Sequence, residues 1–205
     1  MSADDRRHGR SVFGFVLELV LISAGVFLGL LANNWHEDRE HHAKTQEAIR
    51  NFVSEMQTNL QAMESKRQYH ETLAKELDQF LSSGEAPTED RLFKEVHYAG
   101  AQPILFEHTA WDLALATQSL SYLPSDLAFE VSKVYTKQAA FETLENSFLA
   151  AGFMPGTYSA ENLKAFAGSL RFYLRDVNSQ EPPMIDLYRK VIPELRKALD
   201  PGAGR

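Results

Sequence analysis

The sequence predicts an all-α membrane protein, in which one N-terminal transmembrane helix continues into a long helix and an extramembrane helical bundle follows. Residues 12–32 form one apolar run, and apolar residues recur at helical spacing along the rest of the chain. No stretch shows the alternation of apolar and polar residues that is typical of strands. We therefore divide the chain into a tail (1–11), a transmembrane helix (12–32) and an extramembrane helical domain (33–205).

The composition of the chain excludes several classes of function. The net charge is −7, and no block of Lys and Arg follows the apolar run, so we expect no nucleic-acid partner. The chain contains no cysteine, which excludes disulfides, thiolate catalysis and Cys-ligated metal centres. At 24% charged and 44% hydrophobic residues, the composition is that of an ordinary globular protein with a real core.

The apolar run 12–32 has the length of a membrane span and carries one charged residue, Glu18. At a rise of about 1.5 Å per residue it covers roughly 30 Å, the thickness of the hydrocarbon core of a bilayer. The apolar region of a signal peptide is shorter, at about 7–15 residues, and ends in a small-x-small cleavage site. Here Leu30 lies where the first small residue would be required, so we interpret the run as an uncleaved anchor.

The basic residues that flank the span predict its orientation. The tail carries three arginines, Arg6, Arg7 and Arg10. On the other side the first basic residue is Arg39, farther from the boundary, and Trp35 lies where an indole favours the headgroup layer. We therefore expect a single-pass membrane protein with a cytoplasmic N-terminus. In a Gram-negative bacterial cell this orientation means an inner-membrane protein with a periplasmic C-terminal domain.

Four residues of the span fall on one helical face at 100° per residue: Glu18, Gly25, Gly29 and Ala32. Gly25 and Gly29 form a small-xxx-small motif, which lets two helix backbones approach closely. A polar residue beside a glycine groove is what a helix–helix contact would use. The alternative is that glycine is simply common in spans and that Glu18 reaches back toward the headgroups.

Residues 34–82 contain neither Gly nor Pro, and they predict one long helix. One row at heptad spacing comprises Ile49, Met56, Met63, His70 and Leu77. A second row fills the intermediate positions and comprises Val53, Leu60, Arg67, Ala74 and Leu81. Two polar residues, His70 in the first row and Arg67 in the second, interrupt this apolar face. The interruptions favour packing against later helices of the same chain over a coiled-coil stalk.

Five further helices are predicted beyond the break at 82–87. Their ranges are 89–99, 110–118, 126–151, 160–177 and 183–199. Thr88 and Ser159 are predicted N-caps, and residues 152–156 are a predicted loop. Because proline suits the first turn of a helix, Pro182 and Pro183 are predicted to start the last one.

Residues 18–39, ELVLISAGVFLGLLANNWHEDR, and residues 110–135 resemble a group of uncharacterised bacterial single-span membrane proteins. In that group a Glu-containing anchor runs into an Asn-Asn-Trp-x-Glu-x-Arg signature, followed by a long helix. The signature positions here are Asn33, Asn34, Trp35, Glu37 and Arg39. The resemblance implies a membrane-anchored helical protein and carries over no catalytic residue. The simplest role of the five residues is to cap, anchor and solvate the membrane exit.

The polar cluster 36–42 contains side chains at helical i, i+4 spacing, but it lacks the His-Glu-x-x-His zincin motif because Glu40 stands at the fifth position. We interpret it as a solvated, salt-bridged helix, with metal or pH sensing through His36, His41 and His42 as the alternative. A second cluster comprises Glu107, His108 and Asp112, but no nucleophile elbow accompanies it.

These observations predict a membrane-anchored helical interaction or accessory protein that is not an enzyme and has no cofactor. Its expected partners are the lipid bilayer and either another protein or a second copy, bound through the transmembrane helix. One alternative is a sensor-like ligand-binding bundle, with a pocket lined by His97, His108 or Trp111. The other is a hydrolase that uses His108 and Asp112.

Overall fold

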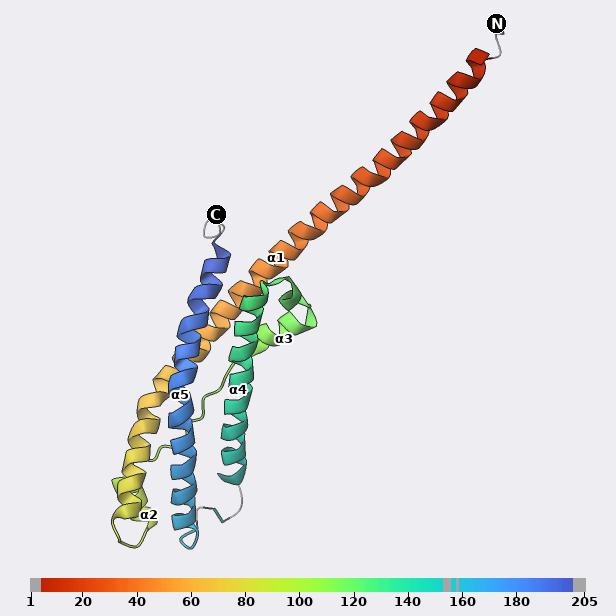
Figure 1. Cartoon of the computed structure of the whole chain (residues 1–205). Coiled ribbons are helices and arrows are strands. Elements are labelled where there is room, and N and C mark those ends of the chain that lie inside the picture. Colours follow the sequence, from red (N-terminus) through yellow and green to blue (C-terminus); the bar gives the residue numbers. More distant parts are fainter. Residues whose placement is uncertain (1–4, 153–155, 158, 201–205) are drawn as a thin grey trace. The chain divides into compact units, whose positions relative to one another are not determined.

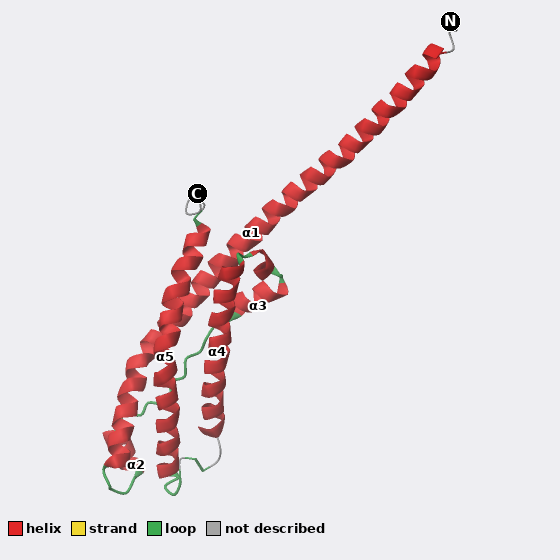
Figure 2. Ribbon diagram, viewed as in Figure 1, coloured by secondary structure: helices red, strands yellow, loops and turns green. Residues whose placement is uncertain are grey.

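The computed structural model describes residues 5–152, 156–157 and 159–200, and within these ranges the chain is helical with no strand (Figure 2). The helices are α1 (Asp5–Ser82), α2 (Glu89–Glu95), α3 (Thr109–Ala116), the 3₁₀ helix η1 (Ser119–Tyr122), α4 (Ser125–Gly152) and α5 (Leu163–Leu199). The predicted all-α class is confirmed. The chain divides into two compact units, Met1–Lys44 and Thr45–Arg205, which are described separately.

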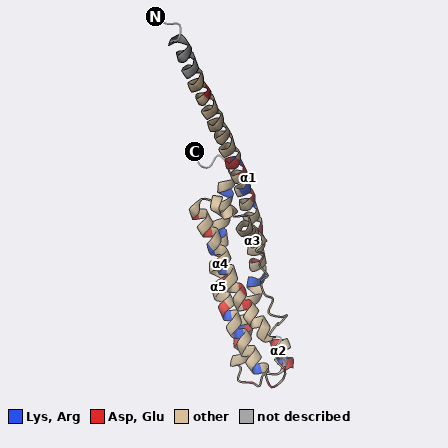
Figure 3. Ribbon diagram, turned by 90° about the vertical axis from the view of Figure 1, so that its right-hand side faces the viewer, with Lys and Arg blue, Asp and Glu red and all other residues tan. Residues whose placement is uncertain are grey.

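The first unit is helical throughout its described part, and residues 14–40 are all exposed. By length and composition, α1 is the one helix in the described part of the chain that is apolar enough to cross a membrane. None of its apolar window is buried against other residues. The stretch 14–32 contains one charged residue, Glu18, and Figure 3 shows this end of α1 almost entirely in the colour of uncharged residues.

The second unit is built on three long helices, the 45–82 part of α1, α4 and α5 (Figure 1). α5 runs antiparallel to α1, because Gln46 Nε2 donates to the carbonyl of Ala198 at one end and Arg171 meets Asp78 at the other. α5 is also antiparallel to α4. The rings of Phe148 and Tyr173 stack near the start of α5, with centroids 4.2 Å apart.

The heptad row of α1 faces the core of this unit, as all five of its members are buried: Ile49, Met56, Met63, His70 and Leu77. Phe52, Leu73 and Phe80 complete the buried face. Arg67 stays partly exposed and forms an ion pair with Glu71. The prediction that this helix packs against the chain's own later helices is confirmed, and His70 is a core residue rather than a break in the seam.

The shorter helices agree with the predictions in position and differ at their ends. Thr88 caps α2 as predicted, accepting a hydrogen bond from the backbone N–H of Arg91. α2 ends at Glu95 rather than 99, because Val96 is extended. α3 ends at Ala116, two residues early, and Gln118 beyond it takes a left-handed conformation.

The prediction of two separate helices at 160–177 and 183–199 is wrong, because α5 is one helix from Leu163 to Leu199 with Pro182, Pro183 and Pro193 inside it. The predicted cap at Ser159 is also wrong, since Asn162 precedes the first helical residue. The residues predicted to face inward from 160–177 are all buried, namely Leu163, Phe166, Leu170, Tyr173 and Val177. In the predicted loop 152–156, residues 153–155 lie outside the described residues.

Candidate functional site

The predicted contact face of the span lies open to the surroundings. Glu18, Gly25, Gly29 and Ala32 are all exposed. A Cβ added at Gly25 or Gly29 would meet no atom within 4 Å outside its own helix backbone and chain neighbours. The two glycines therefore form a shallow strip along α1 that a second helix backbone can approach.

The membrane-exit signature is likewise exposed on α1, at Asn33, Asn34, Trp35, Glu37 and Arg39. The guanidinium carbon of Arg39 lies 4.8 Å from the centre of the Trp35 ring, a cation–π contact one turn apart. Farther along, the hydrogen bond and charge of Lys44 lower the pKa of Glu40. These contacts join residues one helical turn apart, as is typical of a solvent-exposed helix.

The two polar clusters found in the sequence do not come together into a site. Within the described ranges, no group of three His, Cys, Asp or Glu side chains is placed to hold a metal, so His36, His41 and His42 do not converge. His108 and Asp112 are both exposed at the start of α3. The backbone N–H of Asp112 donates to the carbonyl of His108, which is an ordinary helical bond. In this described part of the chain, their side chains form no hydrogen bond with each other.

The residues proposed to line a ligand pocket come from two places in the fold. His97 is exposed and pairs with Glu76 through its Nδ1, at 2.8 Å. Trp111 is partly buried and stacks on Tyr135, with centroids 5.0 Å apart. His97 lies just beyond the end of α2, whereas His108 and Trp111 both lie at the start of α3.

Sequence reasoning missed a row of polar side chains inside the bundle. They are Glu55, Asn59, His70, Gln138, Glu145 and Glu181, and each is buried. Burying such groups is costly unless hydrogen bonds replace the lost water. Their partners are found mainly in residues 99–108, an extended stretch that we call the crossing segment, which passes between α1 and α4 (Figure 1).

The crossing segment receives its backbone hydrogen bonds from side chains instead of from a neighbouring strand. The amide of Asn59 donates to the carbonyl of Glu107 at 2.7 Å and accepts from its N–H at 2.8 Å. The hydroxyl of Tyr69 accepts from the N–H of Ala99 and donates to the carbonyl of Gly100. Gly100 has φ of +88°, a conformation that an L side chain rarely adopts.

His70 and Glu181 form a buried pair that joins α1 to α5 and to the crossing segment. His70 Nε2 lies 3.2 Å from the carbonyl oxygens of Ala101 and Gln102, and because carbonyls only accept, this nitrogen carries a proton. His70 Nδ1 lies 2.7 Å from Glu181 Oε1. One further proton lies between these two atoms, so the pair as a whole is neutral whichever atom holds it.

Glu145 is the neighbouring buried carboxyl, on α4. Its Oε1 accepts from the backbone N–H of Ile104 at 2.7 Å, and the hydroxyl of Tyr173 lies 3.5 Å away. Burial raises the pKa of Glu145 from 4.5 to about 7, against the opposing effects of the Ile104 N–H and of His70, while Glu181 raises it further. Its ionisation therefore falls close to neutral pH.

Glu55, on α1, binds the backbone just beyond the C-terminal end of the crossing segment. It accepts from the N–H of Ala110 at 2.7 Å and from the hydroxyl of Tyr135 at 2.6 Å. Burial and the hydrogen bond to Glu55 raise the pKa of Tyr135, so this phenol remains a donor. The buried polar residues thus hold the backbone from Ala99 to Ala110 against α1 and α4.

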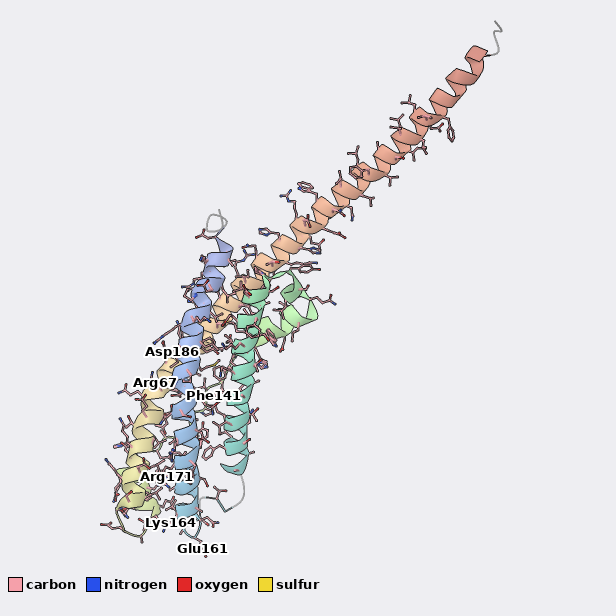
Figure 4. All side chains as sticks on the ribbon, viewed as in Figure 1. Arg67, Phe141, Glu161, Lys164, Arg171 and Asp186 are labelled. Atoms are coloured by element: carbon pink, nitrogen blue, oxygen red, sulfur yellow. The ribbon has the colours of Figure 1, made fainter. Side chains whose placement is uncertain are left out.

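A separate groove of about 390 Å³ lies on the outside of the bundle, between α1 and α5. Its lining combines charged and apolar side chains: Ala74, Asp78, Arg171, Phe172, Arg175 and Asn178. Arg171 is labelled near the start of α5 in Figure 4. None of the three residues predicted to line a pocket belongs to this groove.

The chain matches no family model, no curated protein and no solved structure. Membership of the group that the Asn33–Arg39 signature resembles therefore stays a prediction.

Proposed function

We propose that this chain is a membrane-anchored helical interaction protein, an accessory subunit that binds another membrane protein or a second copy through its span. The observation that carries the proposal is the exposed face of Glu18, Gly25, Gly29 and Ala32, which is open along its length. A carboxyl group within a span costs about 2–3 kcal/mol. A hydrogen bond from a partner helix would offset that cost, and the glycine strip would admit the partner's backbone.

The second unit supports this role as a folded, ordered domain. Its buried polar side chains bind the crossing segment and one another through specific hydrogen bonds. The bundle is therefore suited to act as a scaffold with one defined packing arrangement. A scaffold fixed to a membrane helix suits a subunit that positions or stabilises other proteins.

The proposed location is the inner membrane of a bacterium, with the tail in the cytoplasm and the bundle in the periplasm. The support is the distribution of Arg6, Arg7 and Arg10 before the span. A reporter that is active only in the periplasm, fused after Arg205, is expected to be active. Activity of a cytoplasm-specific reporter at the same position would reverse the orientation.

The test of the contact face is crosslinking of the full chain in membranes, followed by mass spectrometry. We expect Gly29→Leu to reduce the crosslinked product at least several-fold, because the added side chain fills the strip. Ala24→Leu is the matched control, since Ala24 lies about 120° from Glu18 around the helix and should leave the product unchanged.

Two outcomes would overturn the proposal. One is recovery of the uncrosslinked chain alone. The other is an equal effect of Gly29→Leu and Ala24→Leu, which would show that bulk anywhere on the span matters and that the face does not.

A further inference from the structure

The groove between α1 and α5 presents opposite charges side by side. Arg171 and Arg175 are one helical turn apart on α5, so their like charges oppose each other unless an anion lies between them. Asp78 on α1 is the one acidic residue of the lining, and its Oδ1 lies 3.7 Å from Arg171 Nη1. This distance is too long for a strong hydrogen bond, so the guanidinium retains free donors.

Arg175 offers the groove a guanidinium group whose N–H donors have no partner among the described residues. It is exposed, and no hydrogen bond or ion pair is recorded for it among the described residues. A guanidinium has five N–H donors in a fork that matches a carboxylate. Arg171 is held beside it, with its guanidinium carbon 5.3 Å from the centre of the Phe172 ring.

The apolar part of the groove comes from Phe172 and Ala74. Phe172 is exposed by 60%, which is unusual for a phenylalanine on a helix whose other apolar residues are mostly buried. The volume of about 390 Å³ lies within the range of small-molecule sites. The groove thus offers two cationic groups, one anionic group and an apolar wall.

We propose that this groove binds a free α-amino acid with an apolar side chain. Its carboxylate pairs with Arg175 and Arg171, its ammonium group pairs with Asp78, and its side chain lies against Phe172. A simple anion would face the repulsion of Asp78, and a simple cation would face two guanidinium groups. A zwitterion satisfies both signs of charge at once.

The experiment is calorimetric titration of the full chain in a nonionic maltoside detergent, with empty micelles as the blank. The probes are L-phenylalanine, L-leucine, 3-phenylpropionate, which lacks the ammonium group, and 2-phenylethylamine, which lacks the carboxylate. We expect saturable binding of the two amino acids, and binding of the other two compounds that is about tenfold weaker or more.

The variants Arg175→Gln and Asp78→Asn are expected to weaken binding of L-phenylalanine by about tenfold. Both residues are exposed, so the fold should be retained, and circular dichroism checks this. Arg196→Gln and Asp186→Asn are the matched controls, because they remove the same charges outside the groove. Asp186 lies farther along α5 than Arg171 in Figure 4.

Three results would overturn the proposal. The first is no saturable binding of either amino acid at millimolar concentration. The second is equal affinity for L-phenylalanine and 3-phenylpropionate, or no effect of Asp78→Asn, which would make the groove a plain anion site. The third is a loss of affinity in the control variants as large as that in Arg175→Gln. None of these results bears on the contact face of the span, which is tested separately.

Discussion

Single residues decide how a helical bundle can hold an extended, partly buried stretch of backbone. A backbone N–H or carbonyl group without a partner in the interior costs about as much as a lost hydrogen bond. Here Asn59, Glu145 and Glu55 supply those partners from the faces of α1 and α4. These polar residues are therefore part of the core, in the same sense as the leucines around them.

Glu145 makes the stability of the bundle depend on pH. Its pKa is about 7 in the folded chain and 4.5 as an ordinary carboxyl, so the folded state holds the proton more tightly. Its contribution to stability is fully present below pH 4.5 and is lost as the pH rises to about 7, by on the order of 3 kcal/mol. We expect Glu145→Gln to match the wild type near pH 4.5 and to be more stable than it at pH 8. Urea unfolding of both proteins at the two pH values measures this.

Glu142 lies on the same helix, and Glu142→Gln is the control for the loss of one negative charge. Its side chain makes no recorded hydrogen bond to the described residues, so the free energy of unfolding should change little with pH relative to the wild type. A Glu145→Gln variant that is less stable at pH 8 would contradict the assignment, because it would mean that the carboxylate is needed in its charged form.

The sequence predicts part of this arrangement at the scale of residues. The heptad register places His70 on the buried face of α1, and its burial follows from that register. Its partner Glu181 lies 111 residues away, and no local pattern connects the two. The residues of the polar core are thus recognisable as interruptions of apolar rows, while their pairing depends on the tertiary fold.

At the scale of elements, α5 shows packing prevailing over local preference. Pro182 and Pro183 leave the carbonyls of Asn178 and Ser179 without helical N–H donors, and local rules favour a helix start at this point. The buried stripe nevertheless continues through it, with Val177 before the prolines and Ile185 after them, and both residues are almost fully buried. Both prolines lie outside the fully buried stripe, so the lost bonds fall away from the core.

Replacing the exposed proline should strengthen this helix. We expect Pro183→Ala to raise the free energy of unfolding by roughly 1–3 kcal/mol, since it restores a donor and removes a clash, less the entropy gained by the unfolded chain. Chemical denaturation measures the change. Pro124→Ala is the control, because Pro124 precedes α4 and its replacement restores no bond inside a helix. An unchanged or lower stability of Pro183→Ala would show that the helix is built around the proline.

The prolines also explain why the sequence does not predict every helix boundary. Apolar spacing predicts α1 and α4 to within a residue or two in the second unit, because neither 45–82 nor 126–151 contains a Gly or Pro that would suggest a break. For α5 the same spacing is present on both sides of Pro182, but the sequence alone offers no measure of how much burial outweighs two missing bonds. The end of α2 is missed for a similar reason, since Val96 is drawn into the core in an extended conformation.

At the scale of the whole molecule, the buried apolar core lies entirely within the second unit, from Ala48 to Leu195. A fragment of residues 45–205 should therefore fold without the span, as a water-soluble helical domain with one cooperative thermal transition. Circular dichroism during heating measures this. A fragment of residues 60–205 lacks Ile49, Phe52 and Met56, and it should unfold at a clearly lower temperature or not fold. Aggregation of the longer fragment would contradict the prediction.

The fold class and the span are predictable from the sequence because both depend on periodicity and length. The groove between α1 and α5 is not, because Asp78 and Arg175 come close only through the antiparallel packing of two distant helices. The predicted pocket residues His97, His108 and Trp111 were chosen for their chemistry, and none of them lines this groove.

The crossing segment has a consequence for the order in which the protein is assembled during synthesis. α1 leaves the ribosome before α4 and α5, so the partners of its interior face do not yet exist when it emerges. Asn59 has no partner until Glu107 has been made, and His70 has none until Glu181, 111 residues later, has been made. Until α5 has been translated, this face of α1 lacks its partners, so the nascent chain is exposed to proteases and chaperones during much of its synthesis.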